Sequence, residues 1–391
     1  MRRIGVDERR ARLGLRHHLA TGARAPDVAT VARDLAGLHA TDPSTVYLAA
    51  AARLRAPEVG AIERALYEDR SLVRMLGMRR TMFVEPVDLA PVVHAACTAA
   101  IGANLRRQLV KAIQELGLAP DGDAWLRKAE DQTVAALAAR GEALAAELND
   151  DVPALREKLQ YGGEQPWAGP QPIGYRVLSV LAADGRIVRG RPRGSWTSGQ
   201  YRWSLLEAWL PGGLPELPAA AAQAELARAW LAAFGPATVA DLKWWTGWTV
   251  ATTRRALAAV GAVEVELDDG LGLVLPDDTD QAPEAAPWVA LLPALDPTTM
   301  GWKERAWHLG DHGKALFDTN GNAGPTIWAD GRVVGGWAQR KDGEIPVRLL
   351  EDTGAEVAAA VDAEAARLRA WYGDVRTTPR FRTPLERELT A

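Results

Sequence analysis

Two polar residues separated by one alanine stand directly before an Asp-Pro pair near the start of the chain. They are His39 and Thr41, and Asp42 follows at once. An imidazole with an ordinary pKa is largely neutral near pH 7, so it can orient a water molecule or accept a proton from it. A threonine hydroxyl can hold the same water, and a neighbouring carboxylate can fix the imidazole tautomer. His39, Thr41 and Asp42 are therefore candidate catalytic residues for a reaction with water.

Each of these residues also has a structural alternative. Asp42 precedes Pro43 and Ser44, and Asp-Pro is a common pair at the start of a helix, where the aspartate caps the helix and proline takes its first position. His39 is also consistent with a partly buried histidine that takes no part in a reaction. Both alternatives stay open at the level of sequence.

The composition limits the class of protein. The 391 residues carry a formal net charge of -4, and a chain of this length suggests two to four domains. The single cysteine, Cys97, excludes an internal disulfide and a cysteine-based zinc site. No apolar run is long enough to span a membrane, and the arginine-rich start lacks the apolar core of a signal peptide. We expect a cytoplasmic protein with no membrane partner.

A metal site is weighed and not favoured. His308 and His312 are four residues apart with Asp311 between them, a spacing that could place two ligands on one helical face. Gly310 and Gly313 weaken that helix, and no third ligand is apparent. We expect an exposed turn here, and neither a metal nor a cofactor.

A weak repeat organises the middle of the chain. Residues 141–148 and 235–242 share the spacing from glycine to leucine, and each segment joins two predicted helices. In each copy a further helix then leads into a glycine and a strand, at residues 175–188 and 252–265. Helix, turn, helix and hairpin is the order of a winged helix, in which the last helix can enter a DNA groove. Winged helices also serve as structural modules, so the order alone does not establish DNA binding.

The two predicted hairpins differ in charge. Residues 263–275 contain four acidic residues and no basic residue, whereas residues 186–203 contain five arginines and no acidic residue. The basic hairpin is therefore the predicted DNA contact, because basic and small polar side chains bind phosphate oxygens. An arginine-rich hairpin that is merely solvated is the alternative. The predicted contacts of this hairpin are Arg186, Arg189, Arg191, Arg193, Ser195, Trp196, Tyr201 and Arg202.

The patterns as a whole predict an α+β fold. After a linker rich in proline and aspartate at 276–287, strands are predicted at 288–293, 326–329, 332–337 and 346–350, followed by a helix at 354–372. We expect tandem winged-helix motifs followed by a C-terminal β-rich, barrel-like domain. The predicted domains are an N-terminal winged-helix-like unit (1–120), a second winged helix with a basic wing (121–212), a third with an acidic wing (213–276) and the β-rich domain (286–391).

Two motifs carry a resemblance to a known family. The chain resembles the AlkZ-like (YcaQ) family of bacterial DNA glycosylases, which usually read Gly-Leu/Val-Gln-Ala-Gln-Asp-Pro where this chain has Gly37 to Pro43. His39 and Thr41 stand in place of the two glutamines. A second family pattern, Val-Arg-x-x-x-Met-Arg-Gly-Thr-Leu-His, is matched at Val73, Arg74, Met78, Arg79 and Thr81, while Arg80 replaces its glycine and Phe83 its histidine. Segments 292–296, 301–305 and 330–337 resemble the family's C-terminal domain.

The resemblance implies a function. It implies a monomeric, monofunctional glycosylase that hydrolyses the bond between deoxyribose and an alkylated, often bulky purine in double-stranded DNA, with the triplet at 39–41 in the active site and Arg79 and Arg80 at the DNA. No cofactor and no obligatory protein partner is expected. Because the usual glutamines are replaced, a non-catalytic winged-helix protein that regulates genes or senses lesions is the alternative.

Overall fold

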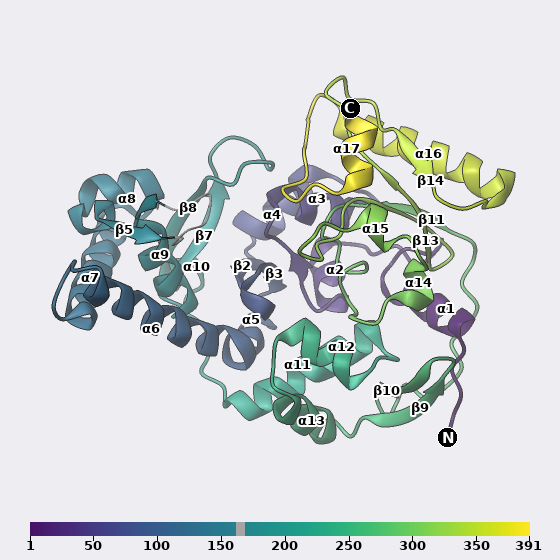
Figure 1. Ribbon diagram of the computed structural model, residues 1–391, viewed down its shortest axis with the longest axis horizontal. Helices are drawn as coiled ribbons and strands as arrows, with labels where there is room; N and C mark the ends of the chain where they lie inside the picture. The colour runs from purple at the N-terminus through teal and green to yellow at the C-terminus, as the bar shows by residue number, and fades with distance from the viewer. Residues whose placement is uncertain (162–168) are drawn as a thin grey trace.

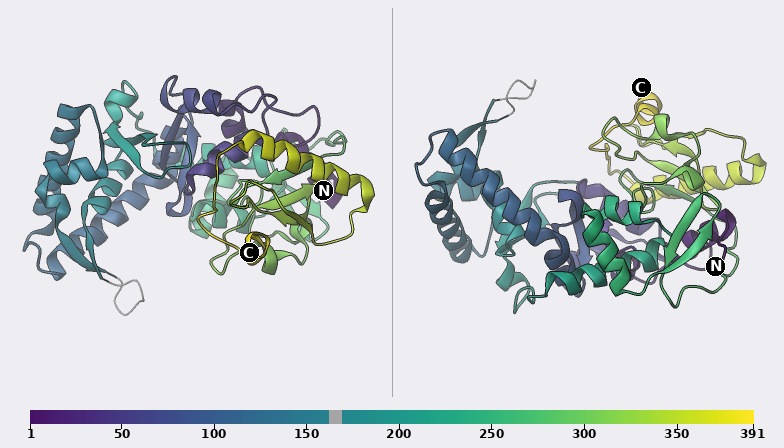
Figure 2. Two further views of the ribbon diagram at one scale, coloured as in Figure 1. Left: turned by 90° about the horizontal axis from the view of Figure 1, so that it is seen from above. Right: turned by 60° about the horizontal axis from the view of Figure 1, so that its bottom comes forward.

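The computed structural model describes residues 1–161 and 169–391. Helices and strands are interspersed along the chain, which confirms the α+β class. Figures 1 and 2 show an elongated molecule, with residues 99–209 at one end and residues 288–391 at the other. No helix of the described residues is both long and apolar enough to cross a membrane.

The N-terminal part is built around a small antiparallel sheet. Three consecutive strands pair in the order β1-β3-β2, and we call residues 28–86 the first unit. Its order is helix, strand, helix, helix, strand, strand. The sequence predicts a winged-helix-like unit here too, within residues 1–120. The elements up to this point are α1 (Val6–Arg16), α2 (Val28–Asp34), β1 (Leu38–His39), α3 (Pro43–Ala51), α4 (Val59–Tyr67), β2 (Leu72–Leu76), η1 (Met78–Arg80) and β3 (Met82–Pro86).

The second unit, residues 122–209, repeats that order with an added hairpin, and its sheet pairs as β4-β8-β7. A long helical stretch leads into it from the first unit, made of α5 (Ala90–Val93), η2 (His94–Thr98) and α6 (Ala99–Glu115). The unit's own elements are α7 (Gly122–Arg140), β4 (Glu142–Leu144), α8 (Ala145–Asp151), η3 (Pro153–Arg156), β5 (Lys158–Tyr161), β6 (Gly169–Pro172), α9 (Gly174–Ala183), β7 (Ile187–Pro192), β8 (Tyr201–Leu205) and α10 (Leu206–Trp209).

The third unit, residues 219–274, has the same order again, with an isolated bridge between Ala237 and Leu273 in the place of the first strand. The acidic hairpin forms as predicted, and β9 pairs with β10. The elements are α11 (Ala219–Phe234), α12 (Val239–Thr246), α13 (Val250–Ala259), β9 (Val263–Leu267) and β10 (Gly270–Val274).

The C-terminal unit, residues 288–391, contains an antiparallel sheet in the order β11-β12-β13-β14. The order is linear and the outer strands β11 and β14 do not pair, so within the described residues this sheet is open and the predicted barrel-like closure is not found. Asp330 and Gly331, both with positive φ, make the predicted turn between β12 and β13. The elements are β11 (Val289–Leu292), α14 (Ala306–Leu309), α15 (Gly313–Leu316), β12 (Thr326–Ala329), β13 (Arg332–Trp337), β14 (Val347–Leu349), α16 (Gly354–Tyr372) and α17 (Pro384–Thr390).

One apolar core includes residues from both sides of a predicted domain boundary. The domain limits themselves stay a prediction. Leu109 and Ile113 of α6 lie before the expected boundary at residue 120, yet they share one apolar cluster with the second unit. The first and C-terminal units are joined by a fully buried ion pair, in which the Arg53 guanidinium donates two hydrogen bonds, of 2.6 and 2.9 Å, to the Asp296 carboxylate. Arg53 also donates to the Ala49 carbonyl near the end of α3. The ion pair with Asp296 therefore holds α3 in place, and with it residues 39–42, which directly precede that helix.

Candidate active site and nucleic-acid interface

The segment containing the triplet is held by the first unit's sheet. In β1, Leu38 pairs with Val84 and His39 with Phe83 of β3. The pairing continues one residue further, because the Ala40 amide donates to the Met82 carbonyl at 2.7 Å. Arg74 of β2 donates to the Ala40 carbonyl at 3.2 Å. The backbone between the two candidate residues is therefore fixed from both of the other strands.

His39 lies inside the protein and is 4 % exposed. Its ring is 5.3 Å from the ring of Phe83, and the Thr41 amide donates to its Nδ1 at 3.5 Å. That contact leaves the proton of a neutral ring on Nε2. Burial, and to a smaller extent the nearby Arg79 guanidinium, lowers the pKa of His39 from 6.5 to about 3. The imidazole is therefore neutral near pH 7 and a weak proton acceptor.

Thr41 is the triplet residue that lines a groove. Strand β1 ends at His39, so the chain turns and the Thr41 side chain leaves the core. Its Oγ1 accepts from the Met82 amide at 3.4 Å, which restrains the hydroxyl at the groove wall. Of the three candidates, Thr41 has the placement needed to meet a ligand in the groove.

Asp42 makes the contacts of a helix cap. Its Oδ1 accepts from the Ser44 amide at 3.0 Å and from the Ser44 hydroxyl at 2.7 Å, and Pro43 takes the first position of α3. The structural alternative for this residue is therefore observed. Its Oδ2 accepts from the Arg380 amide at 2.9 Å, so the same carboxylate also attaches the C-terminal segment to the triplet.

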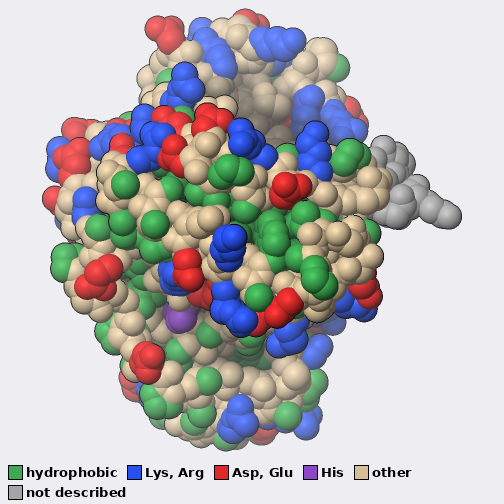
Figure 3. All heavy atoms as spheres, turned by 90° about the vertical axis from the view of Figure 1, so that its left-hand side faces the viewer, with side chains coloured by type: hydrophobic (Ala, Val, Ile, Leu, Met, Phe, Trp, Pro, Cys, Tyr) green, Lys and Arg blue, Asp and Glu red, His purple; other side chains and the backbone are tan. Residues whose placement is uncertain are grey.

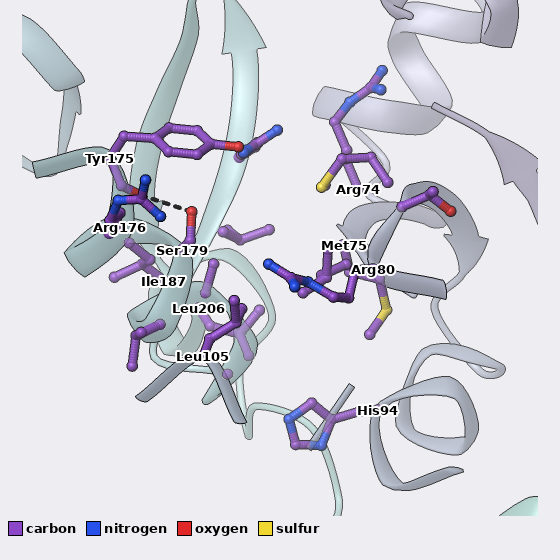
Figure 4. Close-up of a pocket in the computed structure, with 18 of the residues that line it drawn as sticks. Arg74, Met75, Arg80, His94, Leu105, Tyr175, Arg176, Ser179, Ile187 and Leu206 are labelled. Atoms are coloured by element: carbon purple, nitrogen blue, oxygen red, sulfur yellow. Dashed lines mark hydrogen bonds between the residues drawn. The ribbon is translucent and has the colours of Figure 1, made fainter. Parts of the chain in front are cut away.

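The groove lies between the first and second units and has a volume of about 340 Å³. Figure 4 shows Arg74, Met75 and Arg80 on one side, and Tyr175, Arg176, Ser179, Ile187 and Leu206 on the other. Among the described residues, its lining includes five arginines and no aspartate or glutamate, and much of the remainder is apolar. This surface suits an anion that also carries an apolar part.

The two arginines of the η1 turn differ in placement. Arg80 is exposed and lines the groove, as expected of a DNA contact. The Arg79 guanidinium packs instead over the Trp244 ring of α12, 3.9 Å from its centre, and burial lowers the pKa of Arg79 to about 10. Both residues have positive φ, so the backbone turns sharply between β2 and β3.

The predicted basic hairpin is largely neutralised by carboxylates from other elements. Three of its arginines form ion pairs with two carboxylates each: Arg186 with Glu130 and Asp131, Arg191 with Glu63 and Glu68, and Arg202 with Glu142 and Glu147. Arg193 and Ser195 are exposed near the tip. The prediction rested on the absence of acid along this stretch, and it did not include acids that the fold brings near in space.

The hairpin's aromatic residues are not displayed to solvent, contrary to expectation. Trp196 is buried against three rings, those of Tyr47, Trp371 and Tyr372. It therefore anchors the tip of the hairpin to α3 and α16. Tyr201 is buried as well, with the Arg74 guanidinium 4.7 Å from the centre of its ring. Burial of large apolar surface accounts for both placements.

Some groove residues were missed by sequence reasoning. Tyr175, Arg176 and Arg380 line the groove. Tyr175 and Arg176 begin the helix predicted within residues 175–188, but that pattern does not single out either side chain, and Arg380 falls outside every motif. Arg74 was marked by the second family pattern alone. On the face of the molecule drawn in Figure 3, Lys and Arg side chains are mixed with Asp and Glu.

The expected exposed turn around His308 is not observed. His308 is buried and its ring stacks on Trp328 with the ring centres 5.1 Å apart, whereas His312 bonds Glu351 at 3.2 Å. The part of the chain that the structure describes holds no group of three residues suited to bind a metal ion.

Comparison with known proteins assigns the family. The family model described as DNA glycosylase AlkZ-like matches residues 32–371. The chain belongs to this family. Among solved structures, the AlkZ-like chain is similar to Streptomyces sahachiroi DNA glycosylase AlkZ, with a TM-score of 0.74, 22% sequence identity, and coverage of 94% of this chain and 97% of that one. At this identity the similarity shows a shared fold. No curated protein matches the AlkZ-like chain.

Proposed function

We propose that this protein is a DNA glycosylase that hydrolyses the N-glycosidic bond of an alkylated, bulky or crosslinked purine in duplex DNA. The observation that carries the proposal is the position of Thr41, which lies in the family's active-site motif and lines the arginine-rich groove. Such an activity serves base excision repair or self-resistance to an alkylating agent. The three repeated units act as winged helices that hold the duplex, and the protein acts as a monomer.

The chemistry needs little from the protein. A purine alkylated at N3 or N7 is cationic and already a good leaving group, so the bond to C1′ breaks with its electron pair moving to the base. Water then adds its oxygen to C1′ and releases a proton to solvent. The protein holds the DNA, places the water and stabilises the oxocarbenium-like sugar.

The triplet divides this work between its residues. Thr41 Oγ1 holds the water at the groove wall. His39 acts through neutral hydrogen bonding, since an imidazole whose pKa is about 3 takes up no proton near pH 7. Asp42 positions both by capping α3 and fastening the Arg380 backbone. The exposed side chains of Arg80, Arg193 and Ser195 contact phosphates.

The test is release of the base from duplex oligonucleotides that carry a defined N3- or N7-alkylpurine, detected as an alkali-labile abasic site. We expect release by the wild type, and a fall of about 10²-fold for Thr41→Ala, in line with removal of one polar group at a reacting centre. Thr21→Ala, which alters a hydroxyl bonded to the Pro287 carbonyl, is the matched control and should keep full activity. Release that is unaffected by Thr41→Ala contradicts the assignment.

A second candidate function is favoured by one observation. His39 is packed against Phe83 inside the protein, which is also the arrangement of a structural histidine. A non-catalytic DNA-binding protein, acting as a regulator or lesion sensor, would bind alkylated duplexes and release no base from any N3-alkylpurine, N7-alkylpurine or crosslink. The same assay, run beside a binding measurement, distinguishes the two functions.

A further inference from the structure

Tyr175 is a large aromatic residue whose side chain is mostly exposed to solvent. It lies in the first turn of α9 and is 68 % exposed, and it lines the groove opposite Arg74 (Figure 4). The Arg189 guanidinium donates a hydrogen bond to the Tyr175 hydroxyl. The ring is therefore held over the groove with its faces available for contact.

The groove wall near Tyr175 carries charge that no carboxylate compensates. Arg74 is buried and pairs with no described carboxylate within 4 Å; its Nε and Nη2 have no hydrogen-bond partner within 3.5 Å, and the groups near it that favour its charged form are the side chains of Tyr201, Tyr67 and Tyr47. Arg189 likewise pairs with no described carboxylate within 4 Å, and both guanidinium groups lie over the Tyr201 ring, at 4.7 and 5.9 Å from its centre. An unpaired buried cation is costly. An anion that entered the groove would offset that cost.

The floor of the groove suits a planar apolar group. Met75, Leu105, Ile187 and Leu206 supply apolar side chains, and the volume of about 340 Å³ falls at the lower end of the range for small-ligand pockets. A nucleotide combines the two required features, since its base is flat with two π faces and its phosphate is an anion. Bases stack on aromatic side chains with little regard to sequence.

From the exposed ring, the uncompensated arginines and the apolar floor, we propose that the groove receives one unstacked nucleotide of the bound DNA. The base lies against Tyr175, and the phosphate faces Arg74 and Arg189. Charge complementarity favours this occupant, because a cationic ligand would be repelled by five arginines. This site rests on the proposed function, because that function supplies the bound DNA. Tyr175 would then allow the protein to distinguish a duplex with an unstacked base from a regular duplex.

The experiment compares two duplexes, one with a single bulged adenine and one with an abasic residue at the same bulge. Wild-type protein should bind the adenine bulge about 5- to 150-fold more tightly, because only that duplex offers a base to the ring. Tyr175→Ala should bind both duplexes equally. Tyr175→Phe should keep the preference, and so should Leu271→Ala, which shortens another exposed side chain on the distant acidic hairpin. Dissociation constants from fluorescence anisotropy at one fixed salt concentration give these ratios.

The outcomes separate the two proposals. A preference that persists in Tyr175→Ala, or that is absent in the wild type, overturns the nucleotide site and leaves the glycosylase proposal standing if base release is observed. Failure to bind any of the duplexes overturns the nucleotide site, and it overturns both proposals when no base is released from alkylated DNA either. As an independent arm, Arg189→Met should reduce the slope of log Kd against log salt by about 1, the loss of one phosphate contact, and an unchanged slope counts against the phosphate part of the site.

Discussion

Replacing His39 with glutamine should make the protein less sensitive to acid. The folded pKa of His39 is about 3, against an ordinary value of 6.5. Below pH 6.5 the unfolded chain therefore takes up a proton that the folded protein does not bind until the pH nears 3. Linkage requires the wild type to lose stability over that window as the pH falls. A glutamine takes up no proton in either state, so the variant lacks this source of destabilisation.

The size of the effect follows from the two pKa values of His39. A fall from 6.5 to about 3 corresponds to about 5 kcal/mol of folding free energy when the whole window is crossed, because a tenfold change in proton affinity is worth about 1.4 kcal/mol. At pH 4 the linkage amounts to about 3 kcal/mol. Loss of the contact with Phe83 should lower the stability of the variant by a constant amount at every pH.

The measurement is urea unfolding of wild type and His39→Gln between pH 8 and pH 4, followed by tryptophan fluorescence. The difference in unfolding free energy should be constant from pH 8 to pH 7 and then shift by about 3 kcal/mol in favour of the variant by pH 4. A difference that stays constant down to pH 4 would refute the burial argument, and with it the assignment of His39 as a neutral group in the reaction.

Two further substitutions test buried charges. Asp296→Ala leaves the Arg53 guanidinium without its carboxylate in a site that is 0 % exposed, and it should lower the free energy of unfolding by about 3–5 kcal/mol. The control Asp88→Ala removes an exposed ion pair with Arg33 and should lower it by at most about 1 kcal/mol. Equal losses of unfolding free energy in urea would contradict the reasoning. Glu85 is buried, and neither of its carboxyl oxygens has a hydrogen-bond partner in the described structure. Burial raises its pKa well above 4.5. The folded protein is therefore fully stable with respect to this group below pH 4.5, and it loses that stability as the pH rises through the folded pKa. Glu85→Gln should therefore gain thermal stability over the wild type as the pH rises above 4.5, and a melting-temperature difference that does not change with pH would count against this.

Much of the fold follows from local patterns. Helix α16 begins and ends within a residue of its predicted range, because its apolar spacing is regular and glycines stand at both ends. The acidic hairpin and the Asp330-Gly331 turn were equally evident. Closure of the C-terminal sheet is different, since it depends on pairing between strands distant in the chain. The two residues of β1 are too short a run to show the period of a strand.

The candidate site was less accessible to sequence reasoning, for a related reason. Arg191 looked unpaired because no acid lies near it in the sequence, yet Glu63 and Glu68 are 128 and 123 residues away and pair with it. The sequence predicts Trp196 as a DNA contact of the hairpin, yet its ring packs against residues of α3 and α16. Charge and exposure depend on tertiary contacts that a local pattern does not contain.

The replacement of the family's first glutamine by His39 is milder than the residue types suggest. A glutamine side chain offers one carbonyl acceptor and an amide donor, and stays uncharged at every pH. A neutral imidazole also offers one acceptor and one donor, and the low pKa of His39 keeps it in that form near pH 7. Nδ1 already accepts from the Thr41 amide, which leaves Nε2–H as the donor. Burial thus gives the histidine the hydrogen-bonding character of the amide it replaces, while Thr41 alone is placed to meet the groove.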